Sequence, residues 1–175
     1  FSIALWLKTE NWGAEVGRAG ALIADNYCFW CSPSTGWLFW IYTDKFWFPV
    51  NHNASVTGAE YPDYKDKWTH VVFTKDGGGQ TTLYFDGSEV SSYVEHAPWV
   101  TPYFPSGENI EIARRADEGW YFKGIIDEVA IYNRALPPGE IQPHYQNGLA
   151  GLGYDSLTPE ASKEISGVDR IAETP

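Results

Sequence analysis

Hydrophobic and polar positions alternate with a period of two from the first residue of the chain. Along one side of an extended segment, the apolar side chains fall at Phe1, Ile3, Leu5 and Leu7. The intervening positions hold Ser2, Ala4, Trp6 and Lys8. Because successive side chains point to opposite faces of a strand, this alternation predicts a β-strand with one buried face. Further runs rich in β-branched and aromatic residues predict strands at 21–24, 36–43, 46–50, 69–75, 81–86, 110–114 and 123–132.

The segment 69–90 carries the clearest turn signals. The glycine-rich run 76–79 (DGGG) can supply the positive φ angles that a tight turn needs between two apolar runs. The pair Asp86-Gly87 supplies a second tight turn before residues 88–90. Together they predict a three-stranded antiparallel meander.

One short segment has the pattern of a helix. It opens at Pro137-Pro138, places Ile141 and Tyr145 on one face at i and i+4, and meets a stop signal at Asn147-Gly148. We therefore expect one or two helical turns near residues 138–146. Many short strands with so little helix predict an all-β fold, an antiparallel sandwich of two sheets.

Composition divides the chain into two parts. The length of 175 residues and the hydrophobic content of 43% suit one globular domain. After Gly148 the sequence turns polar, so we expect the domain over 1–148 and a tail over 149–175. Within the tail, Ile165, Val168 and Ile171 are apolar and could let residues 164–172 act as an extended edge or donor strand in a strand exchange.

Charge and hydropathy exclude two classes of partner. The net charge of -11 opposes binding to nucleic acid or to an anionic membrane surface, since both require clustered Lys and Arg. No apolar run approaches the roughly 18 residues needed to cross a bilayer. We expect neither nucleic-acid binding nor membrane insertion.

Two cysteines and one sequon allow modification. Cys28 and Cys31 are too few for a zinc site, and a thioredoxin-like redox pair would need a βαβ context that their aromatic neighbours do not suggest. A local disulfide or two packed thiols is the simpler interpretation. Asn53 begins an Asn-Ala-Ser sequon in a polar loop, which could be glycosylated in a secretory pathway or be an ordinary loop residue.

Three blocks in order over about the first 148 residues resemble the laminin-G-like jelly-roll domains of the concanavalin A-like lectin/glucanase family. The blocks are 1–8 (FSIALWLK), 68–76 (WTHVVFTKD) with 83–87 (LYFDG), and 124–136 (GIIDEVAIYNRAL) with 140–141 (EI). The resemblance implies two antiparallel sheets packed face to face, with loops left free to bind. It implies no single ligand, because members bind sugars, proteins or calcium and some are enzymes.

The chain departs from the family at its start. Family members usually have one or more strands before the Trp-containing strand, whereas here the sequence begins on that strand at Phe1. A jelly roll without its first strand would expose a sheet edge. The simplest explanation is a truncated sequence; otherwise the tail or a neighbouring copy of the chain would supply the strand, and exchange between copies would build a homopolymer or fibre.

The carboxylates predicted on strands do not have the spacing of a glycosidase pair. Glycosidases of this fold place two carboxylates on the same face of one strand, but Asp127 and Glu128 are adjacent and are predicted to point to opposite faces. Asp127 would share its face with Ile125, Val129 and Ile131, and would therefore lie near the core and hydrogen-bond the amides of a neighbouring loop.

No catalytic motif is present elsewhere in the sequence. The nucleophile elbow, the phosphate loop and the His-Glu-x-x-His pattern are all missing, and the histidines are scattered at His52, His70, His96 and His144. We expect His70, which alternates with strand residues, to be a hydrogen-bonded framework side chain. The chain is predicted to be non-catalytic, with an enzyme built on a dispersed acidic site as a weaker alternative.

Aromatic residues offer the best binding chemistry, because a flat ring can stack on a sugar. The strand-borne tryptophans Trp6, Trp37, Trp40 and Trp68 are expected in the core. Those in loop-like segments are the predicted ligand-binding residues: Trp12, Trp99, Tyr103 and Trp120. No cofactor is required, but Asp117 and Glu118 could bind a structural calcium, with Asp86 and Glu128 as further oxygen ligands.

Two functions follow from these features. The first is a non-catalytic extracellular structural or adhesive module that assembles with copies of itself through strand exchange into a homopolymer or fibre. The alternative is a carbohydrate-binding module of a larger secreted enzyme or adhesin, with extracellular glycans as partners. Both place the chain outside the cell or at its surface.

Overall fold

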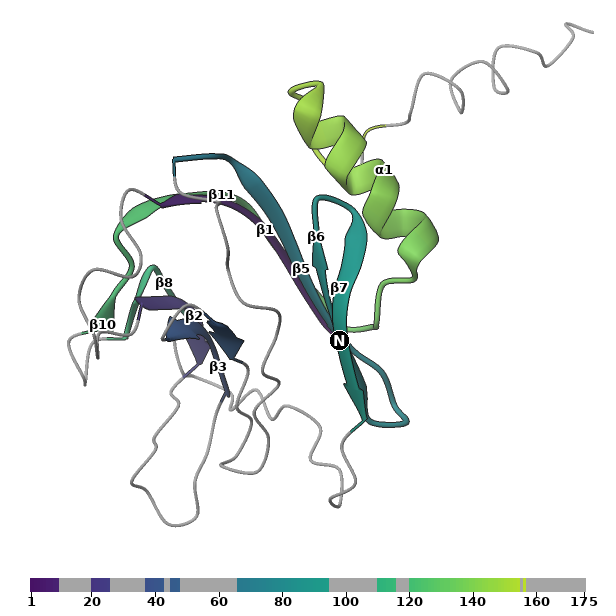
Figure 1. Cartoon of the computed structure of the whole chain (residues 1–175), viewed down its shortest axis with the longest axis horizontal. Coiled ribbons are helices and arrows are strands. Elements are labelled where there is room, and N and C mark those ends of the chain that lie inside the picture. Colours follow the sequence, from purple (N-terminus) through teal and green to yellow (C-terminus); the bar gives the residue numbers. More distant parts are fainter. Residues whose placement is uncertain are drawn as a thin grey trace, which may run out of the picture.

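A computed structural model describes residues 1–9, 20–25, 37–42, 45–47, 66–94, 110–115, 120–154 and 156. Over these residues the chain is an antiparallel jelly-roll sandwich with one helix, which confirms the predicted fold class (Figure 1). The strands are β1 (Ser2–Thr9), β2 (Gly20–Asp25), β3 (Trp37–Tyr42), β4 (Lys45–Trp47), β5 (Thr69–Lys75), β6 (Gln80–Phe85), β7 (Ser88–Val94), β8 (Ile110–Ile112), β9 (Arg114–Arg115), β10 (Trp120–Tyr121) and β11 (Gly124–Tyr132). The helix is α1 (Pro138–Leu149).

Two sheets form the sandwich. One has five strands in the order β11-β1-β5-β6-β7, and the other has four in the order β4-β3-β2-β8. The strands β9 and β10 form a separate two-stranded ribbon. The five-stranded sheet arches over β2, β3 and β8, while α1 lies on its opposite side (Figure 1).

The predicted meander is present as β5-β6-β7. Phe85 pairs with Ser88, and the two residues between them, Asp86 (φ 49°) and Gly87 (φ 78°), both have positive φ. This is the geometry of the type I′ turn that Asp-Gly favours. At the other end, Asp76 Oδ1 accepts hydrogen bonds from the backbone N–H groups of Gly78 (2.8 Å) and Gln80 (2.9 Å), which fixes the β5–β6 turn.

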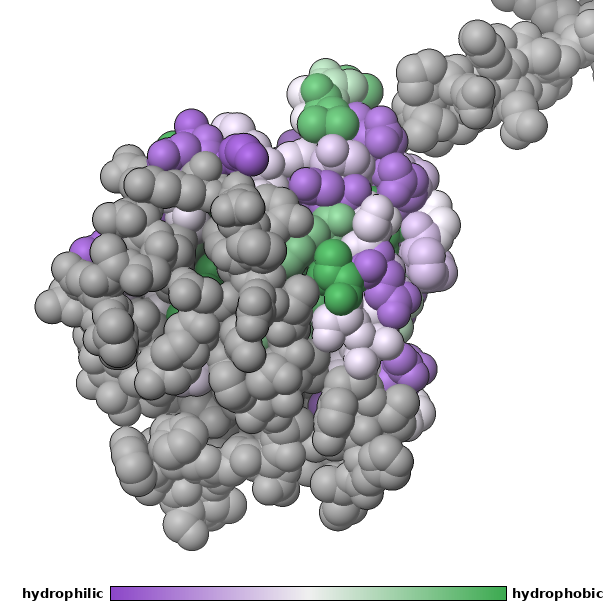
Figure 2. Space-filling view, viewed as in Figure 1, coloured by the Kyte–Doolittle hydropathy of each residue, from purple (hydrophilic) through white to green (hydrophobic). Residues whose placement is uncertain are grey.

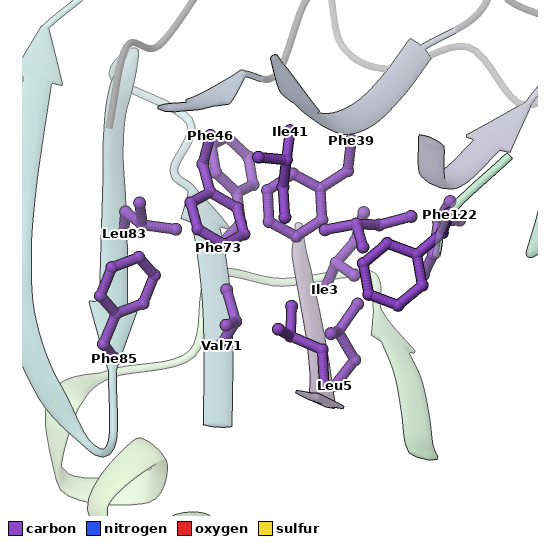
Figure 3. Packing of buried hydrophobic residues seen from close by; sticks show 13 residues of the cluster. Ile3, Leu5, Phe39, Ile41, Phe46, Val71, Phe73, Leu83, Phe85 and Phe122 are labelled. Carbon is purple, nitrogen blue, oxygen red and sulfur yellow. The ribbon is translucent and has the colours of Figure 1, made fainter. Parts of the chain in front are cut away.

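The core between the two sheets is built around four phenylalanine rings. Phe39 lies 5.7 Å from Phe46 and 5.9 Å from Phe73, centroid to centroid, and Phe46 lies 5.1 Å from Phe85 (Figure 3). Phe39 and Phe46 come from the four-stranded sheet and the other two from the five-stranded sheet, so the rings join the layers. Such tilted ring pairs add to the free energy gained from burial alone.

The prediction of one buried face for β1 is wrong, because its second face is buried as well. Ala4 and Trp6 on that face are 0% and 7% exposed. Helix α1 covers this side of the sheet, where Leu136 and Ile141 pack against Ala4 in a second hydrophobic cluster. The strand pattern did not show a helix lying over it.

Helix α1 is longer than predicted, with 12 residues, and it does not stop at Asn147-Gly148. It ends instead at Leu149, and Gly151, the residue after the C-cap Ala150, adopts φ 69°. There the N–H of Leu152 donates to the carbonyl of Asn147 (2.8 Å) and the N–H of Gly151 donates to that of Gly148 (3.0 Å), the two bonds of a Schellman motif. Gly148 has another role, because it brings the helix into close contact with the indole of Trp6.

The outward surface of α1 is mostly hydrophilic, and hydrophobic side chains gather at its C-terminal end, where Leu149 and Leu152 are exposed (Figure 2). Within the described ranges, no helix has the length and apolar character needed to cross a bilayer.

A β-bulge corrects the predicted position of Asp127. Ala4 pairs with Ala130 but Trp6 pairs with Asp127, so Glu128 and Val129 together lie opposite Leu5. Glu128 adopts φ 49°, and the alternation of faces breaks there. Val129 therefore packs on the core while Asp127 is exposed, and the Asp127 carboxylate accepts a hydrogen bond from the Glu128 N–H (2.8 Å) within the bulge.

The tryptophans predicted in the core differ in how deeply the structure buries them. Trp6 is buried and Trp40 packs partly buried against Leu38 and Ala24, but Trp68 is 43% exposed. Trp68 immediately precedes β5, so the sandwich does not enclose it. The side chain of Trp37 lies outside the described part.

Candidate functional site

The edge strand β8 of the four-stranded sheet and the neighbouring ribbon of β9 and β10 form an exposed surface. The run 110–114, predicted as one strand, is divided because Ala113 adopts φ 62°. The N–H of Ala113 donates to the carbonyl of Leu22 (2.9 Å), and the N–H of Phe122 donates to the carbonyl of Ala113 (2.8 Å). Phe122 is buried in the core and Ala113 packs against it, so this surface is anchored to the sandwich.

Tyr121 is exposed, whereas its neighbour Phe122 is buried in the core. Tyr121 is 60% exposed, the highest exposed fraction of the aromatic residues whose burial the structure describes. In the β9–β10 ribbon Tyr121 pairs with Arg114, so their side chains share one face. We call Glu111, Arg114 and Tyr121 the platform.

An ion pair lies beside the tyrosine ring. Oε1 of Glu111 accepts hydrogen bonds from Nη2 (2.8 Å) and Nε (3.1 Å) of Arg114. These bonds to Glu111, followed by the attraction of its carboxylate, raise the pKa of the Arg114 guanidinium above its usual value. The ring offers an apolar face for stacking, and the ion pair offers hydrogen-bond donors and acceptors next to it.

Of the residues that the sequence predicted for binding, one falls in this region. Trp120 lies in β10 next to Tyr121 and pairs with Arg115, although its side chain is not described. Asp117 and Glu118, the predicted calcium ligands, belong to the connection between β9 and β10, outside the described residues. The other predicted positions are also outside them and stay predictions: Trp12, Trp99, Tyr103, Cys28, Cys31, Asn53, Ile165, Val168 and Ile171.

Sequence reasoning did not single out any of the three platform residues. Tyr121 adjoins the predicted Trp120, and alternation with the apolar Phe122 could have indicated which of the two faces the solvent. Glu111 and Arg114 gave the i, i+3 spacing of an ion pair, but in a predicted strand that spacing puts them on opposite faces. The bend at Ala113 brings them together.

A second group of polar and aromatic side chains lies buried or partly buried between α1 and the five-stranded sheet. We call Trp6, His70, His144, Tyr145 and Tyr154 the aromatic–histidine layer. The ring of His70 lies 5.2 Å from that of Trp6 and 5.6 Å from that of Tyr154. Tyr154 stacks on His144 at 4.8 Å, and Trp6 stacks on Tyr145 at 5.7 Å. The rings hold the helix against the sheet.

His70 is a framework residue, but its ring is packed rather than hydrogen-bonded as predicted. The residue is fully buried, and neither ring nitrogen has a hydrogen-bond partner. Burial, with a smaller contribution from nearby His144, lowers the pKa of His70 to about 4. His70 is therefore neutral at neutral pH.

Three carboxylates outside the platform, those of Asp86, Asp127 and Glu128, interact with other groups of the fold. Asp86 Oδ1 accepts a hydrogen bond from the backbone N–H of His70 (2.9 Å) and thereby joins β5 to the β6–β7 turn. Burial, and next to it the charges of Glu128 and Asp127, raise the pKa of the Tyr154 phenol. Both carboxylates thus lie close enough to the phenol of Tyr154 to act on its pKa.

Metal-ligating side chains do not converge in the part of the chain that the structure describes. No three His, Cys, Asp or Glu residues of that part lie close enough together to hold a metal ion.

The sequence of the domain matches a known family. The model of the concanavalin A-like lectin/glucanases superfamily matches residues 1–142. The chain belongs to this superfamily. The match confirms the resemblance seen in the three sequence blocks, which all lie within it. Among curated proteins, none matches the sequence.

Solved structures share the fold of this superfamily member at low sequence identity. The binding domain of botulinum neurotoxin serotype G matches at TM-score 0.61 and 20% identity, over 84% of this chain and 36% of that chain. The receptor-binding domain of botulinum neurotoxin D matches at TM-score 0.61 and 16% identity, over 85% and 37%. A protein of Bacteroides ovatus described as carbohydrate-binding matches at TM-score 0.60 and 15% identity, over 81% and 39%. The chain thus spans less than two fifths of each of these solved chains.

Proposed function

We propose that this domain is a non-catalytic glycan-binding module that acts outside the cell or at its surface, and that the platform is its binding site. The observation that carries the proposal is the 60% exposed ring of Tyr121 paired with Arg114, whose guanidinium is held by Glu111. A pyranose ring can stack its C–H face on the tyrosine while its hydroxyls hydrogen-bond the ion pair.

The fold and its neighbours agree with a binding role. One solved structure of the same fold is described as a carbohydrate-binding protein and others as receptor-binding domains. Glycoside hydrolysis needs two carboxylates flanking the scissile bond. Among the described platform residues Glu111 is the only carboxylate, and it is bound to Arg114. Because the platform supplies its own donors and acceptors, we propose that binding requires no metal.

Replacing Tyr121 with Ala is expected to weaken binding to a retained polysaccharide at least about tenfold, the loss of roughly 1.4 kcal/mol of stacking. The measurement is native affinity electrophoresis of wild type and Tyr121→Ala in gels containing a series of soluble polysaccharides. Trp120→Ala in the same series tests the sequence prediction for that residue.

Two controls make this experiment decisive. Trp68→Ala removes another exposed ring, and Val90→Ala removes an exposed apolar side chain from β7 at the far edge of the five-stranded sheet. Both should be retarded like wild type, and EDTA should change nothing. If no polysaccharide retards the wild type, or if Tyr121→Ala is retarded equally, the platform is not a glycan site.

We propose self-assembly as a second candidate function, through a strand added to the edge of β11 by another copy of the chain. β11 is the edge strand of the five-stranded sheet, and its Ile125 and Ile131 are 52% and 37% exposed. Exposed apolar edge strands favour pairing between chains.

The expected result is a molar mass, measured by light scattering, that rises with protein concentration. Ile125→Lys should abolish the rise, because a charged side chain on an edge opposes strand addition. The matched change Val90→Lys, on the other edge strand of the same sheet, should leave it intact. A wild-type mass that stays monomeric at every concentration would remove this candidate.

A further inference from the structure

We infer that the platform selects neutral polysaccharides and rejects anionic ones, because the carboxylate of Glu111 is paired with the guanidinium of Arg114, the positive charge that an anionic sugar would need. This inference rests on the proposed glycan-binding function and adds the chemical class of the ligand.

The geometry of the ion pair favours hydroxyl groups. Glu111 takes up two of the five N–H groups of the guanidinium, at Nε and Nη2, while 53% of the Arg114 side chain stays exposed. Arg114 can therefore donate to a sugar oxygen without releasing Glu111. The carboxylate, 26% exposed, can accept from a hydroxyl hydrogen. Neighbouring sugar hydroxyls both donate and accept, so they match a donor beside an acceptor.

The charge of the site opposes acidic sugars. A uronate or sulfate would have to displace Glu111 from Arg114 or leave its own charge beside that carboxylate. The first route breaks two charge-assisted hydrogen bonds, and the second places like charges together. The net charge of -11 on the chain adds a repulsion that acts over a longer distance.

The position of Tyr121 restricts the ligand further. Its ring is on a strand paired with Arg114, so ring and guanidinium are held in a fixed register by the backbone. Stacking on such a ring needs a flat C–H face, which pyranoses with equatorial substituents present. The inferred ligand is therefore a neutral polysaccharide of equatorially substituted pyranoses, such as a β-linked glucan.

Two polymers with one backbone test the inference. Hydroxyethylcellulose is neutral and carboxymethylcellulose is anionic, and both are β-linked glucans. In affinity gels the dissociation constant of the wild type for the neutral polymer should be at least about tenfold lower than that for the anionic polymer. Retardation by the neutral polymer should be insensitive to added salt, because no counterions are exchanged.

The variant Glu111→Gln should change the selectivity. The substitution keeps the shape of the side chain but frees the charge of Arg114, so binding to carboxymethylcellulose should rise about tenfold at low salt and fall again as salt is added. The matched control is Glu89→Gln, which removes the same charge at an exposed position on β7 and should leave both affinities as in wild type.

The outcomes separate the inference from the function on which it rests. Tyr121-dependent binding that prefers carboxymethylcellulose in the wild type, or an equal gain in Glu111→Gln and Glu89→Gln, overturns the inferred selectivity and leaves glycan binding standing. Tyr121-dependent binding to another polysaccharide but to neither cellulose polymer overturns the inferred ligand alone. Retardation by no polysaccharide of the series, or retardation that does not depend on Tyr121, overturns both.

Discussion

Lowering the pH from 7.5 to 4.5 is expected to reduce the free energy of unfolding by about 2.5 kcal/mol through His70 alone. The pKa of His70 is about 4 in the folded chain, against 6.5 for an ordinary histidine. The unfolded chain therefore binds the proton first as the pH falls. The stability that a neutral His70 contributes is complete above about pH 6.5 and is lost progressively as the pH approaches 4.

The surroundings of His70 explain why it resists protonation. Trp6, Tyr145 and Tyr154 pack around the ring, and nearby His144 lowers the pKa further. The carboxylate of Asp86 binds the backbone N–H of His70 rather than the ring. An imidazolium formed here would have no partner for either ring N–H.

Urea unfolding of wild type and His70→Phe at both pH values measures this contribution. Phenylalanine keeps an aromatic ring in the layer and does not titrate, so the loss of stability between the two pH values should be smaller by about 2.5 kcal/mol in the variant. The difference between the proteins removes the contributions of other titrating groups. Equal losses in the two proteins would show that His70 is not the proton-linked residue.

The same substitution at two glycines of α1 is expected to have opposite effects. A Cβ on Gly148 would lie 2.5 Å from Cζ2 and Nε1 of the Trp6 indole, which is buried and cannot move aside. Gly148→Ala should therefore lower the free energy of unfolding by about 1–3 kcal/mol, the usual cost of overpacking. At Gly139 the added carbon meets nothing within 4 Å, so Gly139→Ala should be neutral or stabilise the protein by up to about 1 kcal/mol.

Thermal unfolding together with near-ultraviolet circular dichroism checks this pair. The indole of Trp6 touches the helix, so its signal should change in Gly148→Ala and not in Gly139→Ala. Two variants of equal stability would mean that α1 does not dock closely on the sheet.

Local chemistry decided what the sequence could predict. The β5-β6-β7 meander followed from Asp76 to Gly79 and from Asp86-Gly87, because those residues fix their turns whatever surrounds them. The superfamily blocks then predicted two antiparallel sheets packed face to face, as the structure shows.

Features that depend on tertiary contacts were missed. Glu128 carries no sequence signal for positive φ, so the bulge and the exposure of Asp127 came only from the structure. Gly148 was interpreted as a helix stop because its contact with Trp6, distant in the sequence, was not visible. For the same reason the platform was missed, since Glu111 and Arg114 meet only after the chain bends at Ala113.

The bulge in β11 also limits the strength of any junction made at that edge. It divides the strand into an uninterrupted stretch at 124–127 and another at 130–132, so an incoming strand can form a regular ladder over only one of them at a time. A junction held by so few backbone hydrogen bonds dissociates quickly. Copies joined there would dissociate and rebind continually. An assembly built from them would rearrange its junctions under mechanical force rather than hold one fixed arrangement.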